Sequence, residues 1–150
     1  VPILKKVVRN IATARFTRTL ATLVSSGVML IQALESVRNV MGNVVVAEKL
    51  DIVIEDVKKG KGLTQPLKNM KFFPPLVISM IKIGEESGEL DYSLNKTADI
   101  YEQEVEISVQ QLATMLEPIL IVVLAGVVGF IIISSLFPMF SIYQNLDKMG

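Results

Sequence analysis

Residues 119–136 read ILIVVLAGVVGFIIISSL, a run long enough for a helix that crosses the hydrocarbon core of a bilayer. No charged residue occurs from Pro118 to Tyr143. The strongly apolar residues of the run contribute about −4 to −8 kcal/mol toward insertion, which outweighs its serines and glycines. A buried core helix is the alternative, but a domain this small seldom surrounds a helix that is apolar on every side. The sequence therefore predicts a transmembrane helix at residues 114–138, followed by a short tail at residues 139–150.

Pro118 stands near the start of the predicted span. Proline has no N–H to donate to the carbonyl of Thr114, so we expect the helix to kink near Pro118. Charge does not decide the orientation of the span. Most basic residues precede it and only Lys148 follows it, yet acids outnumber bases in the segment just before it. Long domains also escape the positive-inside rule, so composition leaves both orientations open.

The residues before the span predict a series of helices separated by glycine and proline signals. Phe16, Leu20 and Val24 follow the spacing of one helical face, and that helix ends near Ser25–Gly27. No alternating apolar pattern predicts a strand. The sequence therefore indicates an all-α fold: a six-helix antiparallel bundle at residues 13–113, whose last helix continues into a single C-terminal transmembrane helix. The remaining five helices are expected at about residues 30–41, 44–59, 63–69, 75–87 and from 89 onward.

Three finer expectations concern burial and the N-terminal segment. Residues 76–83 are so densely apolar that the fifth helix is expected to be the central, most buried one. Residues 1–12 carry three bases and no acid, which predicts a basic juxtamembrane linker beside anionic lipid, although a solvated helix start fits equally well. The inward face of the sixth helix is expected to consist of Leu94, Ala98, Tyr101, Val105, Val109 and Leu112.

Composition excludes several classes of function. Lys and Arg together number 15, as do Asp and Glu, so nothing in the charge favours nucleic acid as a partner. The chain contains no Cys and no His, which removes thiol nucleophiles, thiolate metal sites and the commonest general base. Residues 58–64, KKGKGLT, lack the spacing of a phosphate-binding loop and predict a helix stop instead. We expect no catalytic, cofactor-binding or metal site, and no enzyme.

Residues 84–91, GEESGELD, form an acidic corner between the fifth and sixth predicted helices. Gly88 is suited to the left-handed position after a helix, and Asp91 is favoured near the start of the next helix. The needs of the two helix ends account for most of the stretch. Residues 85–106 nonetheless hold eight acids against one base, Lys96, which is more negative charge than helix ends require. An acidic docking face is the sharper hypothesis. Its candidate partner-binding residues are Gly84, Glu85, Glu86, Ser87, Gly88 and Glu89.

Three further positions near or in the span are candidates for contacts with other helices. Glu117 is the only charge between Leu112 and Tyr143, where it either reaches the lipid headgroups or pairs with a cation of a partner. Ala125 and Gly129 have the small-x-x-x-small spacing that lets another transmembrane helix approach closely.

Three stretches together resemble the inner-membrane platform proteins of type IV pili and type II secretion systems, the PilC/GspF family. They are ARFTRTLATLVSSGVMLIQALESV at residues 14–37, MIKIGEESGELDYSLNKTADIYEQEV at 80–105 and MLEPILIVVLAGVVGFIIISSLFPMF at 115–140. The family's Gly-Glu-x-Ser-Gly corner falls on residues 84–88. Its Ala-Arg-Phe opening includes Arg15, and its Glu-Pro at the membrane entrance falls on Glu117 and Pro118, so these residues join the candidate partner-binding set.

The resemblance implies a topology and a function that composition left open. Family members carry two six-helix domains and three transmembrane helices, and this chain is similar to the second domain plus the last span. The bundle is then expected in the cytoplasm and the tail in the periplasm. Such a platform performs no covalent chemistry and couples a cytoplasmic hexameric ATPase to the insertion of pilin or pseudopilin subunits into a filament. The implied partners are that ATPase, pilin or pseudopilin transmembrane helices, other inner-membrane subunits of the machine, membrane lipid and further copies of the chain.

Two other classes of protein remain as alternatives. A tail-anchored membrane enzyme would have to work with carboxylate, Lys, Ser or Tyr side chains alone. A transporter subunit would need a polar path through the membrane, and a single span offers only Ser134 and Ser135 for it.

Overall fold

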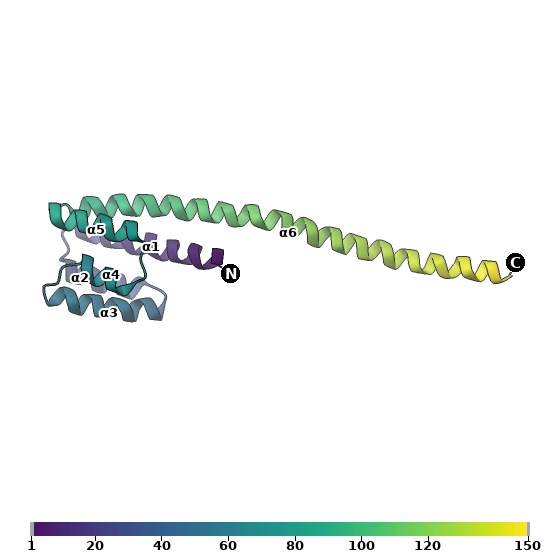
Figure 1. Ribbon diagram of the computed structural model, residues 1–150, viewed down its shortest axis with the longest axis horizontal. Helices are drawn as coiled ribbons and strands as arrows, with labels where there is room; N and C mark the ends of the chain where they lie inside the picture. The colour runs from purple at the N-terminus through teal and green to yellow at the C-terminus, as the bar shows by residue number, and fades with distance from the viewer. Residues whose placement is uncertain (1, 150) are drawn as a thin grey trace. The chain divides into compact units, whose positions relative to one another are not determined.

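The computed structural model describes residues 2–149, and every element in that range is an α-helix (Figure 1). Val1 and Gly150, the ends of the predicted linker and tail, lie outside the described residues. The helices confirm the all-α prediction. They are α1 (Pro2–Ser25), α2 (Leu30–Val40), α3 (Val44–Lys58), α4 (Thr64–Met70), α5 (Pro75–Ser87) and α6 (Leu90–Met149).

Local signals in the sequence set several helix ends. Asn43 starts α3, because its side-chain oxygen accepts a 2.9 Å hydrogen bond from the backbone N–H of Val45. Gly60 and Gly62 follow α3 with φ of 86° and 72°, a left-handed conformation that favours glycine and stops a helix. The predicted helix stop at KKGKGLT is therefore confirmed. Pro75 occupies the first turn of α5, where its missing N–H costs no hydrogen bond.

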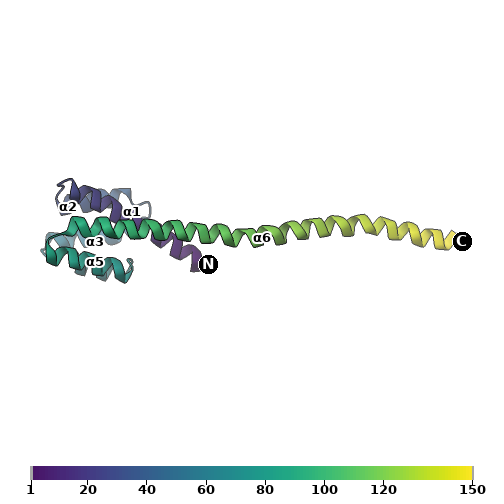
Figure 2. The same ribbon diagram turned by 90° about the horizontal axis from the view of Figure 1, so that it is seen from above.

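The chain divides into two units between Ser108 and Val109. The first unit is the bundle (Figure 2). All six helices contribute buried residues to its core. Phe16 of α1 is fully buried, and its ring centroid lies 4.6 Å from that of Phe73 in the segment before α5. The largest fully buried side chains beside Phe16 are Leu20, Leu34, Leu50, Leu63, Leu67, Ile81 and Leu94.

The expectation that α5 is the most buried helix is wrong. It buries only Val77, Ile81 and Gly84, which form one stripe at i, i+4 and i+7, whereas Leu76 and Ile83 are 46% and 58% exposed. Helix α1 buries eight residues. Apolar density failed as a guide because a helix at the margin of a bundle buries a single stripe, however many apolar residues it carries.

The N-terminal segment adopts the helix start that was one of its two expected forms. Residues 2–12 are the first turns of α1, and their place beside anionic lipid stays a prediction. Val7 and Asn10 are buried there and, with Ala14, continue the buried stripe of the helix. Asn10 donates a 3.4 Å hydrogen bond from Nδ2 to Oγ of Ser108 in α6.

Helix α6 contributes its first turns to the bundle, and its later part contains the predicted span. Leu94, Ala98 and Tyr101 are buried as expected, but Val109 is 49% exposed because the buried face ends at Ser108. The helix is long and apolar enough, by length and composition, to cross a membrane. It passes through Pro118 and Pro138 to Met149, so the predicted tail continues the helix over its described residues. The kink near Pro118 stays a prediction.

Candidate functional site

The acidic corner joins α5 to α6 through two glycines with different roles. Gly88 has φ of 72°, and its N–H bonds to the carbonyl of Gly84, which also accepts a 3.0 Å hydrogen bond from the N–H of Glu89. This is the glycine-ended helix terminus that the sequence predicted. Gly84 lies against the start of α6, where a Cβ would stand 2.8 Å from Cβ of Ser93 and 3.0 Å from Cα of Leu90. Gly84 therefore permits close packing against α6, and Gly88 permits the turn between the two helices.

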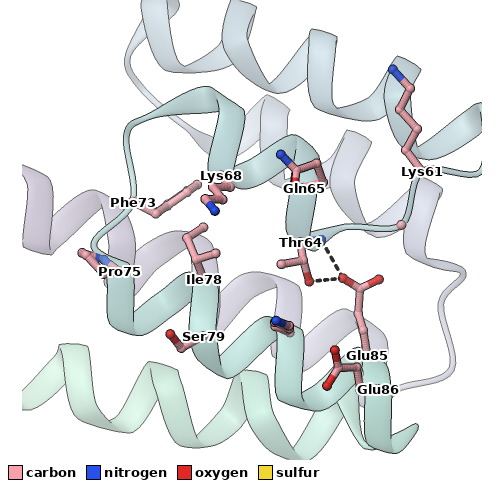
Figure 3. A pocket seen from close by; sticks show the side chains of 12 residues that line it. Lys61, Thr64, Gln65, Lys68, Phe73, Pro75, Ile78, Ser79, Glu85 and Glu86 are labelled. Atoms are coloured by element: carbon pink, nitrogen blue, oxygen red, sulfur yellow. Dashed lines mark hydrogen bonds between the residues drawn. The ribbon is translucent and has the colours of Figure 1, made fainter.

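Glu85 faces the N-terminus of α4 rather than open solvent (Figure 3). Its carboxylate accepts hydrogen bonds from the N–H of Leu63 at 2.9 Å, from the N–H of Thr64 at 2.6 Å and from the Thr64 hydroxyl. The N-cap residue of α4, Leu63, has no side-chain oxygen, so Glu85 supplies the missing cap from another helix. A carboxylate is also favoured by the positive end of the helix dipole.

Sequence reasoning missed this role for Glu85. The available signal was a helix start at Thr64 with no Ser, Thr, Asp or Asn at the N-cap. The free N–H groups of such a helix need a hydrogen-bond acceptor from elsewhere in the chain. Gly62 supports the arrangement, because a Cβ there would stand 2.9 Å from Oε2 of Glu85. The loop after α3 therefore holds a carboxylate of the same chain with its backbone amides.

The other acids of the corner are free of such bonds. Glu86 and Glu89 are exposed, and neither forms a hydrogen bond or ion pair through its side chain within residues 2–149. Ser87 donates a 2.7 Å hydrogen bond to the carbonyl of Ile83. Of the predicted docking residues at the corner, only Glu86 and Glu89 thus present an unengaged charge.

A groove of about 740 Å³ opens between α4 and α5, beside Glu85 and Glu86 (Figure 3). Its apolar lining includes Phe73, Pro75 and Ile78. Its charged lining includes Glu85 and Glu86 together with three lysines, of which Lys61 also forms a 3.6 Å ion pair with Asp56. The remaining lysines are Lys68 and Lys82. The surface beside the corner is therefore mixed in charge, not uniformly acidic.

Arg18 of α1 binds the acidic face of α6, which sequence reasoning also missed. Its Nε donates to Oε1 of Glu102 at 2.8 Å, and its guanidinium also contacts Asp99. A further hydrogen bond of 3.2 Å reaches Oδ1 of Asn95. The hydrogen bonds to Glu102 and then Asp99 raise the pKa of Arg18 above its ordinary value. Two acids of the predicted docking face are thus engaged by a single arginine within the bundle.

Elsewhere on α6, burial and then the charge of Glu104 raise the pKa of the Tyr101 hydroxyl. In the part of the chain that the structure describes, no group of three Asp or Glu residues is placed to hold a metal ion.

The remaining predicted residues belong to other parts of the chain. Arg15 is exposed on α1, next in sequence to the buried Phe16. Glu117 and Pro118 lie on α6 in the second unit, where Glu117 is exposed. Ala125 is also exposed, and a Cβ added to Gly129 would meet nothing within 4 Å. Within the described residues these small side chains are open to an approaching helix.

Comparison with known proteins places these features in one family. The family model described as type II secretion system protein F matches residues 16–138, which include most of the bundle and the apolar run. The chain is 42% identical over 141 residues to a type IV pilus assembly protein PilC of Myxococcus xanthus, covering 94% of this chain and 34% of that protein. It is 41% identical over 147 residues to a PilC of Thermus thermophilus, covering 97% and 36%.

The similarity extends to secretion proteins. The chain is 42% identical over 140 residues to a type II secretion system protein F of Xanthomonas campestris, covering 93% of this chain and 35% of that protein. It thus spans about a third of the length of the curated relatives it matches. The chain belongs to the type II secretion system protein F family, in which its relatives carry the names PilC and protein F.

Proposed function

We propose that this chain is the membrane-anchored part of an assembly platform in a type IV pilus or type II secretion machine. In this role it couples a cytoplasmic hexameric ATPase to the insertion of pilin or pseudopilin subunits into a filament, and it catalyses no reaction itself. The observation that carries the proposal is the family match over residues 16–138, which includes most of the bundle and the apolar run of α6. The names of the relatives, in pilus assembly and in secretion, supply the two kinds of machine.

The exposed apolar side chains of α6 support a location in the inner membrane. Large apolar residues throughout 119–137 are exposed, among them Leu120 at 65% and Phe130 at 73%. A surface of this extent is stable only in lipid or against other helices. The bundle, residues 2–108, is proposed to face the cytoplasm, and the end of α6 the periplasm.

Partner contacts are assigned according to which side chains are free. Glu86 and Glu89 offer the corner's unengaged acids to the ATPase or to another cytoplasmic subunit of the machine. Ala125 and Gly129 offer a close-packing stripe to a pilin or pseudopilin transmembrane helix or to a second copy of the chain. The continuity of α6 from Leu90 to Met149 gives a covalent path along which movement of the bundle reaches the span.

Copurification from the membrane tests the proposal directly. The chain, extracted in mild detergent from cells that assemble the filament, is expected to bring down a hexameric ATPase and a pilin or pseudopilin. Identification of the copurified proteins by mass spectrometry provides the measurement. Recovery of neither partner after chemical cross-linking in the intact membrane would refute the assembly role.

Charge reversal at the corner tests the docking surface. We expect Glu86→Lys to weaken association with the ATPase about fivefold to tenfold. The lysine would repel the basic group of the ATPase that the glutamate is proposed to attract. Glu48→Lys makes the same change at an exposed acid of α3 and is expected to leave association unchanged. Equal binding by both variants, in a folded and membrane-inserted chain, would remove the corner from the docking surface while leaving the copurification result intact.

A further inference from the structure

The N-terminal turns of α1 carry an apolar stripe that the bundle does not cover. Leu4, Val8 and Ile11 lie at i, i+4 and i+7, so they share one face of the helix, and they are 50%, 60% and 38% exposed. In both views these turns extend beyond α2–α5 (Figure 1 and Figure 2). The stripe is distinct from the buried stripe of Val7, which faces the bundle.

Cations without acidic partners share the exposed surface of these turns, with Lys5 and Arg9 next to stripe residues and Lys6 on the opposite side of the helix. Lys5, Lys6 and Arg9 are exposed, and residues 2–18 contain five basic residues and no acid. The ion pairs of the described chain involve none of these three residues. Arg9 instead lies over the ring of Phe72, with its Cζ 5.8 Å from the ring centroid. A groove of about 580 Å³ lies between these side chains.

The size and the charge of this surface favour a bilayer over a protein as its occupant. Three partly exposed apolar side chains cannot supply the ~800 Å² per partner that a stable protein interface buries. An apolar stripe beside unopposed Lys and Arg is the pattern of a helix that lies in the bilayer interface. The apolar run of α6 would also keep a bilayer at high effective concentration around the chain.

We propose that residues 2–12 of α1 bind the surface of a bilayer that contains anionic lipid. Leu4, Val8 and Ile11 enter the boundary between headgroups and acyl chains, while Lys5, Lys6 and Arg9 bind the anionic headgroups. The bundle is thereby held to the membrane at a second point, apart from the span. The inference requires that α6 lies in a bilayer and does not depend on the assembly role.

Lipid quenching of a single probe tests the proposal in the full chain. The chain has no native Cys, so Val8→Cys provides one labelling site for an environment-sensitive fluorophore. In nanodiscs of phosphatidylcholine and phosphatidylglycerol, lipids brominated near the headgroup are expected to quench this probe. Ile52→Cys, at a side chain 65% exposed on α3, is the matched control and is expected to stay unquenched. Ile131→Cys, in the apolar run, reports by itself that α6 is inserted.

Removal of the cations distinguishes anionic headgroups from apolar adsorption. Each of Lys5→Gln, Lys6→Gln and Arg9→Gln is expected to lower the ratio of bound to free helix about fivefold. The same loss is expected when phosphatidylglycerol is omitted. Circular dichroism confirms that these exposed substitutions leave the bundle folded.

Three outcomes would overturn the proposal. One is an unquenched Val8 probe in discs where the Ile131 probe is quenched. Another is equal quenching in phosphatidylcholine alone, since the cations would then contribute nothing. The third is a Val8 probe that brominated lipid fails to quench only when one disc holds two chains. That result would assign the stripe to a second copy of the chain. None of these readouts changes if the ATPase and pilin fail to copurify, so the two proposals fail separately.

Discussion

At the residue scale, Gly84 allows close packing of α5 and α6 because it carries a hydrogen in place of a Cβ. Its Cα lies so near α6 that a Cβ would overlap Cβ of Ser93 at 2.8 Å and Cα of Leu90 at 3.0 Å. We expect Gly84→Ala to destabilise the bundle by about 1–3 kcal/mol, because backbone as well as side chain must move. Urea unfolding of the detergent-solubilised chain, followed by circular dichroism, measures the change.

Gly42→Ala is the matched control for Gly84→Ala. Gly42 has no neighbour within 4 Å of an added Cβ, and its φ is not positive. Its replacement is expected to change stability by no more than about 0.5 kcal/mol in the destabilising direction. Equal losses at the two positions would show that close approach at the corner is not what requires glycine.

Glu85 makes a second prediction at this scale. Its carboxylate accepts from both the Leu63 and Thr64 amides. Glu85→Gln keeps the shape but loses the charge, so we expect these amides to exchange faster with solvent and the bundle to lose about 1–2 kcal/mol. Hydrogen exchange measured by NMR at the two amides checks this directly.

Glu86→Gln provides the comparison for Glu85→Gln, since Glu86 is the exposed neighbour on the same helix. Its exchange pattern at Leu63 and Thr64 is expected to match the parent chain. Unaltered protection of both amides in Glu85→Gln would show that the capping bonds contribute nothing to the start of α4.

At the scale of elements, Arg18 links α1 to α6 through charged groups that remain largely in water. The side chains of Arg18, Glu102 and Asp99 are 35%, 49% and 68% exposed. Exposed ion pairs contribute about 0.2–1 kcal/mol each and weaken with salt. The attachment of α6 to the bundle therefore depends mainly on the burial of Leu94, Ala98 and Tyr101.

Arg18→Ala is expected to cost no more than about 1 kcal/mol, and less at high salt. Unfolding in urea at low and at high ionic strength gives both values. Arg15→Ala changes a nearby exposed arginine and is expected to have no comparable salt-dependent effect. A loss above about 2 kcal/mol in Arg18→Ala would mean that the network acts as a buried one.

The helices themselves were predictable, and the reason is local. Glycine and proline signals such as Gly60, Pro75 and Gly88 act through backbone geometry, which adjacent residues determine. The burial of each helix was less predictable, because it depends on which neighbours pack against it. The exposed face of α5, with Leu76 and Ile83, resembles a core segment in sequence.

The candidate site was predicted only in part for the same reason. The turn at Gly88 follows from its own position in the sequence, so it was correctly expected. The bonds from Glu85 to Thr64 and from Arg18 to Glu102 join residues 21 and 84 positions apart. Such pairings arise from the tertiary fold, and the charge pattern alone made these acids look like one free docking face.

At the scale of the whole molecule, Glu117 is the charged residue that precedes the apolar run. If it pairs with a cation of a partner helix, Glu117→Gln is expected to reduce filament assembly at least about tenfold, because a partly desolvated charge pair loses one member. Counting filaments, or measuring secreted substrate, provides the readout. Protein level and membrane insertion are expected to be unchanged.

Glu106→Gln, at an exposed acid earlier on α6, is the control and is expected to assemble normally. Normal assembly by Glu117→Gln as well would assign Glu117 to the lipid headgroups instead. Glu117 is exposed in the chain by itself, so only its surroundings in the assembly decide between a partner cation and the lipid headgroups.

The bond between Glu85 and the start of α4 also has an evolutionary consequence. Residue 85 is constrained by the fold of its own chain, whereas its neighbour Glu86 has no such bond among the described residues. Invariance at position 85 across species would therefore report on folding and would say nothing about a partner. Covariation of position 86 with a residue of another protein would indicate a shared interface. The two adjacent glutamates are therefore expected to diverge at different rates.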